Sequence, residues 1–97
     1  MNKKNNVYKI HLQEVELKDG RPATKILEFE FENHDDVFGI IEKMQEKNIL
    51  EDSEAAMEFA LGIKLFSEVM LKYKDNALFE ELKPAFGQFM KKLKGKN

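Results

Sequence analysis

Within residues 25–32, apolar and acidic side chains alternate strictly from Leu27 to Glu32, and this alternation restricts the possible folds more than any other feature of the sequence. The apolar side chains are Leu27, Phe29 and Phe31, and the acidic ones are Glu28, Glu30 and Glu32. A period of two residues is typical of a strand with one buried face and one exposed face. Since a strand needs a hydrogen-bonded neighbour, the chain must supply a second strand.

The second strand is predicted upstream, within residues 7–17. Apolar and polar side chains alternate there. The apolar ones occupy even positions from Tyr8 to Leu12 and odd positions from Val15. At this parity change, near Gln13 or Glu14, we expect a bulge. Between the two runs lie Gly20 and Pro22, which are typical turn residues. We therefore predict an N-terminal antiparallel β-hairpin.

Three helices are predicted after the hairpin, because apolar side chains recur there at spacings of three and four residues. The first runs from a capping residue, Asn33, to about Lys47, and the others cover residues 54–73 and 78–93. Pro84 lies inside the last pattern, so we expect a kink or a break at that residue. The predicted fold is α+β, with the element order ββααα.

Each predicted helix contains one glycine, although alanine is favoured inside a helix by about 1 kcal/mol. Gly62 lies on the main apolar stripe of its helix and Gly87 beside its own, which suggests that helices cross closely there. Gly39 projects opposite the apolar face of its helix, and the sequence shows no packing reason for it.

The composition fits one small folded domain. Of the 97 residues, 42 % are hydrophobic and 35 % are charged, so we predict a single domain over 1–97 that is frayed at 1–6 and 94–97. The absence of cysteine excludes disulfides and thiol chemistry and favours a cytoplasmic location. The sequence has no apolar stretch of membrane length, so we expect neither export nor a membrane span.

Three stretches of the sequence resemble one known family. They are residues 29–36 (FEFENHDD), 60–70 (ALGIKLFSEVM) and 86–94 (FGQFMKKLK). The family consists of small bacterial proteins known only as a domain of unknown function. The resemblance implies a compact bacterial α+β protein, and because the family has no assigned activity it brings no catalytic residue.

His34, Asp35 and Asp36 form the cluster that most suggests metal chemistry, since an imidazole beside two carboxylates can bind a divalent cation. A metal-dependent hydrolase centred on these residues is therefore one alternative function. However, the other histidine, His11, lies on the first strand, and adjacent residues at a helix start diverge. Helix capping explains the cluster without a metal. No nucleophile is paired with a base, and the glycines are scattered singly. We predict no catalytic residue, no metal and no cofactor.

Nucleic-acid binding is also disfavoured. The net charge is −2, although residues 61–97 carry +4 and end in a run of lysines. Nucleic-acid sites combine clustered cations with stacking aromatics, but Phe86 and Phe89 lie on the expected core face, and Arg21 is the single arginine. The lysines are better explained as a solvated helix end.

The predicted second helix is more apolar than one amphipathic stripe requires, with thirteen apolar residues among the twenty of 54–73. The surplus side chains are Met57, Leu61, Leu65 and Leu71. Either the third helix covers them within the monomer, or a partner does, and that partner is a second copy or another protein. We interpret the chain as a small non-catalytic interaction or regulatory protein that works through this apolar helix face. A small-ligand-binding module is the alternative.

Overall fold

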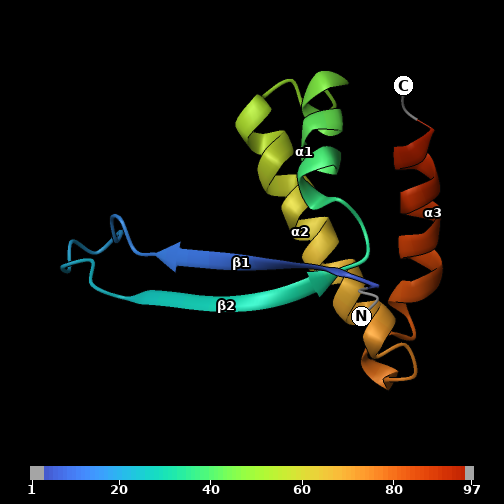
Figure 1. Cartoon of the computed structure of the whole chain (residues 1–97), viewed down its shortest axis with the longest axis horizontal. Helices are drawn as coiled ribbons and strands as arrows, with labels where there is room; N and C mark the ends of the chain where they lie inside the picture. Colours follow the sequence, from blue (N-terminus) through green and yellow to red (C-terminus); the bar gives the residue numbers. More distant parts are fainter. Residues whose placement is uncertain (1–3, 96–97) are drawn as a thin grey trace. The chain divides into compact units, whose positions relative to one another are not determined.

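The computed structural model describes residues 4–95 and confirms the α+β fold with a hairpin followed by helices (Figure 1). The elements are β1 (Asn6–Gln13), β2 (Ile26–Asn33), α1 (Val37–Glu46), α2 (Ser53–Lys72), the short 3₁₀ helix η1 (Ala77–Phe79) and α3 (Leu82–Lys94). No helix among these residues is long and apolar enough to cross a membrane.

The chain divides into two compact units, one that ends at Asp36 and one that begins at Val37. The single domain over 1–97 therefore stays a prediction. Of the ends expected to be frayed, residues 1–3 and 96–97 lie outside the described residues. Asn6 already begins β1, and Lys94 still belongs to α3.

The hairpin forms a two-stranded antiparallel sheet with continuous register. Asn6 lies opposite Asn33 at one end, and Gln13 lies opposite Ile26 at the other. The ladder therefore contains no bulge, and the predicted bulge is wrong. The parity change at Glu14 marks the end of the strand instead.

The helical unit is built around the contact between α1 and α2. Ala56, Ala60 and Ile63 of α2 are buried, and the two alanines let a neighbouring helix approach closely because their side chains are small. The turn before α2 contains Asn48, whose φ of 55° lies in the left-handed region in which helices often end. Asp52 caps α2, because its carboxylate accepts a hydrogen bond from the backbone N–H of Glu54 at 3.1 Å.

A row of phenylalanines joins α2 to the C-terminal segment. The Phe66 ring meets Phe86 of α3 and Phe79 of η1 edge to face, with centroids 5.5 and 6.1 Å apart. Farther along, Phe59 meets Phe89 edge to face at 6.2 Å. Such pairs add about 0.5–1.5 kcal/mol each beyond the burial of their area.

Two predictions about the helices need correction. The kink at Pro84 is not confirmed, because α3 begins at Leu82 and Pro84 lies in its first turn, where a missing N–H breaks no helical hydrogen bond. The interruption falls earlier, between η1 and α3. The predicted close crossing at Gly62 and Gly87 is wrong, because a Cβ atom added at either position would have no neighbouring atom within 4 Å.

Candidate functional site

One face of the hairpin carries six apolar or aromatic side chains. They are Tyr8, Ile10 and Leu12 of β1 and Leu27, Phe29 and Phe31 of β2. At one end the Tyr8 and Phe31 rings stack with centroids 5.4 Å apart, and both residues are half-buried. Toward the connecting loop the exposed fraction rises to 44 % for Phe29, 55 % for Leu27 and 62 % for Leu12. The loop end of this face is therefore an uncovered apolar surface, which we call the hairpin-end surface (Leu12, Leu27 and Phe29).

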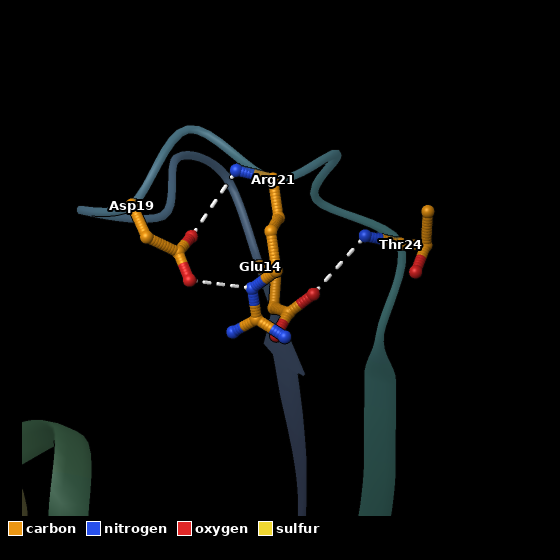
Figure 2. A network of polar contacts seen from close by, with 4 residues as sticks. All are labelled: Glu14, Asp19, Arg21 and Thr24. Atoms are coloured by element: carbon orange, nitrogen blue, oxygen red, sulfur yellow. Dashed lines mark hydrogen bonds and ion pairs between the residues drawn. The ribbon is translucent and has the colours of Figure 1, made fainter.

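The loop that follows this surface is held together by Glu14 (Figure 2). The Glu14 carboxylate accepts hydrogen bonds from the backbone N–H groups of Thr24 and Lys25 at 3.1 and 3.0 Å. The Glu14 backbone N–H also donates to the Lys25 carbonyl oxygen at 3.0 Å. These bonds close the base of residues 14–25, a loop that is much longer than the roughly two to five residues of an ordinary hairpin loop. Here the loop is ordered at its base.

Farther out, Asp19 and Arg21 order the tip of the loop. The Asp19 carboxylate accepts from the Arg21 backbone N–H at 3.1 Å and from Arg21 Nε at 2.6 Å (Figure 2). Between them Gly20 adopts a φ of 79°, which confirms the turn role predicted for it, and its N–H donates to the Leu17 carbonyl at 3.0 Å. The tip of the loop is thus held by local hydrogen bonds.

A hollow of about 420 Å³ lies where the strands meet this loop, lined by Leu12, Glu14, Lys25, Ile26 and Leu27. Three of its lining side chains are aliphatic, and the other two carry charges of opposite sign. Apolar side chains with charged side chains beside them are a common composition of protein–protein contact sites. The hollow extends the hairpin-end surface, so both can contact the same partner.

The opposite face of the hairpin is charged. Lys9 lies opposite Glu30, and the His11 ring lies between Gln13 Oε1, 3.0 Å from Nε2, and Glu28 Oε2, 2.6 Å from Nδ1. Only the protonated imidazole can donate to both oxygens at once. The hydrogen bonds of Gln13 and Glu28 therefore raise the pKa of His11 above its ordinary value of 6.5.

The structure places the His34, Asp35 and Asp36 cluster between β2 and α1. His34 Nε2 lies 3.6 Å from Asp35 Oδ1, but among residues 4–95 no group of three His, Asp or Glu side chains is placed to hold a metal ion. Asn33 is fully buried, and its Oδ1 accepts from the Asp35 N–H at 2.9 Å. The Tyr8 hydroxyl donates to the Asp35 carbonyl oxygen at 3.1 Å. These hydrogen bonds therefore fix the backbone where β2 ends.

The structure does not bring the four predicted interaction residues of α2 into one exposed patch. Met57 and Leu71 are exposed, whereas Leu61 and Leu65 are half-buried. Met57 and Leu71 are fourteen positions apart, which corresponds to about 21 Å along a helix. This helix face therefore has two exposed ends and a partly covered middle.

The hairpin-end surface was absent from the sequence prediction of interaction residues. The sequence alternates in the same way whether the apolar face of a strand is covered or exposed. It therefore could not show that Leu12, Leu27 and Phe29 are exposed. The parity change at Glu14 was a usable signal for the loop base, because it marks where the ladder stops.

Comparison with known proteins adds a family and one solved structure. Residues 6–95 match a family described as a domain of unknown function with solved structure (DUF3861). A crystal structure of a protein of unknown function from Pectobacterium atrosepticum is similar, with 36 % sequence identity and a TM-score of 0.79, and the alignment covers 93 % of this chain and 97 % of that one. The curated proteins gave no match.

Proposed function

The chain belongs to the DUF3861 family, and from this premise we propose that it is a non-catalytic interaction protein that binds a second copy of itself through the hairpin-end surface. The exposure of Leu12, Leu27 and Phe29 on one sheet face carries the proposal. A two-stranded hairpin is marginally stable in water, and a cover over its apolar face stabilises it.

Charge favours a second copy on this face over the opposite one. The hairpin-end surface contains no charged side chain, so two copies can meet there without like-charge repulsion. The opposite face carries Glu28, Glu30 and Glu32 in a row, which outnumber Lys9 and His11 across from them, so pairing with its own copy would bring an excess of carboxylates together.

The expected dimer is weak. Burying the exposed remainder of these three large apolar side chains gives up to about 1.5 kcal/mol each, or roughly 9 kcal/mol over two copies. The lower estimates of the cost of association are about 4 kcal/mol. The proposal therefore predicts a dimer that forms in the high micromolar range and dissociates on dilution.

Sedimentation velocity over a dilution series tests the proposal, with Leu27→Asp as the disrupting variant. Leu78→Asp is the matched control, because Leu78 is an exposed leucine of η1. We expect the wild type and Leu78→Asp to dimerise equally and Leu27→Asp to stay monomeric with an unchanged circular dichroism spectrum. A wild type that is monomeric at about 1 mM, or a Leu27→Asp variant that dimerises like the wild type, contradicts the proposal.

The α2 face predicted from the sequence is a second candidate contact, because Met57 and Leu71 are exposed. The variants Leu61→Asp and Leu65→Asp test whether this helix face is an interface or part of the core. If these variants stay folded but lose self-association, the face is an interface. If they unfold, the half-buried leucines belong to the core and this second contact is wrong.

We also propose a bacterial, cytoplasmic setting. The similar crystal structure comes from a bacterial protein. The absence of cysteine suits a reducing compartment. Fractionation of cells that express the chain with a C-terminal tag tests the location, and recovery outside the cytoplasm contradicts it.

A further inference from the structure

The helical unit contains a second hollow, of about 340 Å³, which is separate from the hairpin. Its lining residues are Ile49 and Leu50 from the turn before α2, Phe59 from α2, and Phe89, Lys92 and Leu93 from α3. We infer that this hollow binds the tail of a small anionic amphiphile, a medium-chain carboxylate, whose head group pairs with Lys92. The inference is independent of self-association by the hairpin.

The floor of the hollow is fixed by packing. The Phe59 and Phe89 rings meet edge to face at 6.2 Å, and Leu93 beside them is buried. Leu50 and Phe89 nevertheless stay partly exposed, at 45 % and 43 %. The site therefore offers packed apolar side chains with apolar area still open to a ligand, and a mainly apolar and aromatic lining is typical of small-molecule sites.

The wall formed by Ile49 and Leu50 is held by a strained turn. Asn48 and Glu51, which flank these two residues, have φ values of 55° and 62°. A glutamate in this region is strained, and such strain concentrates at ligand clamps and switch regions. A hydrogen bond from Gln45 Nε2 to the Ser53 carbonyl oxygen at 3.0 Å also ties the two sides of the turn together. The wall is thus preformed.

The charge at the rim selects the head group. Of the six lining residues, all within the described chain, Lys92 is the charged one. Lys91 and Lys94 lie in the same last turn of α3, and together the lysines outweigh the partial negative charge of the helix end. A cationic rim beside an apolar floor favours a carboxylate over a neutral or cationic head group.

The size of the hollow sets the length of the tail. At about 30 Å³ for each water-sized unit, a volume of about 340 Å³ takes roughly eleven non-hydrogen atoms. This corresponds to a tail of roughly eight to ten carbons. Affinity should therefore rise by up to about fourfold per added methylene and level off near that length.

Isothermal titration calorimetry with hexanoate, decanoate and tetradecanoate tests the inference, with decyltrimethylammonium as the cationic comparison. We expect decanoate to bind more tightly than hexanoate, tetradecanoate to gain little further, and the ammonium compound to bind roughly tenfold more weakly than decanoate.

Two pairs of variants locate the site. Lys92→Gln should weaken decanoate binding by roughly three- to tenfold, whereas Lys91→Gln, in the same turn but outside the lining, should change it by less than about twofold. Leu50→Ser should weaken binding, whereas Leu78→Ser, at an exposed leucine outside the lining, should not. Absence of decanoate binding at about 1 mM, equal binding of the ammonium compound, or equal effects of the two lysine variants overturns the inference.

Discussion

Replacing Gly62 by alanine should stabilise the protein. Gly62 lies in the middle of α2, is exposed, and has room for a Cβ atom with no neighbour within 4 Å. Alanine lowers the entropy lost on folding without a steric cost, which is worth roughly 0.5–1 kcal/mol in a helix. For a chain of about this size, 1 kcal/mol moves the melting temperature by about 4–8 °C. We therefore expect a rise of about 2–8 °C in thermal unfolding followed by circular dichroism at low protein concentration.

The matched comparison is Gly20→Ala. Gly20 also has no atom within 4 Å of an added Cβ, but its φ of 79° lies in the left-handed region. There an L-residue costs roughly 1–2 kcal/mol, so the same substitution should lower stability. Both glycines have open space around an added Cβ. If Gly62→Ala raises stability and Gly20→Ala lowers it, the backbone conformation at each position is therefore the cause of the difference. If Gly62→Ala is neutral or destabilising, α2 is closely approached at this position in solution and the reasoning fails.

Three further predictions concern polar groups. Because the pKa of His11 is raised in the folded hairpin, its stabilising contribution is fully present below 6.5 and is lost as the pH rises through the higher folded pKa. His11→Gln should therefore reduce the loss of stability between about pH 5 and about pH 9, and an NMR titration that shows no raised pKa for His11 would refute this. Asn33→Ala should lower the free energy of unfolding by about 1–3 kcal/mol in urea denaturation, because it leaves the Asp35 N–H without its buried acceptor. Asp52→Ala should cost about 1 kcal/mol through loss of the α2 cap, whereas Asp52→Asn should be nearly neutral, and equal losses would argue against capping.

The sequence was sufficient for the order of the elements because each element has a strong period. The alternation at Leu27, Phe29 and Phe31 gave β2 to within one residue at each end, and the spacing in α2 gave its ends equally closely. The end of β1 was predicted too late, because Val15 and Leu17 are apolar residues of a loop. Val15 is 87 % exposed, so its hydrophobicity carried no information about burial.

The candidate sites were not predictable, because they depend on which apolar side chains remain uncovered. Residue spacing places Gly62 on the main stripe of α2, yet an added Cβ there would meet open space. In the same way, periodicity assigns Phe89 to the core face of α3, although its ring is partly exposed beside the hollow. The exposure of a side chain depends on how the elements pack together, so it cannot be predicted from the residue spacing within one element.

Both candidate sites lie beside turns that polar side chains hold in place. The Glu14 carboxylate closes the loop next to the hairpin-end surface, and the Gln45 amide spans the turn that carries Ile49 and Leu50. An exposed apolar residue gains little from burial, so packing alone would leave it mobile. Local hydrogen bonds fix its position without covering it, and a fixed apolar surface loses less entropy on binding. This arrangement favours binding over core formation as the role of these side chains, since a core would hold them without the polar bonds.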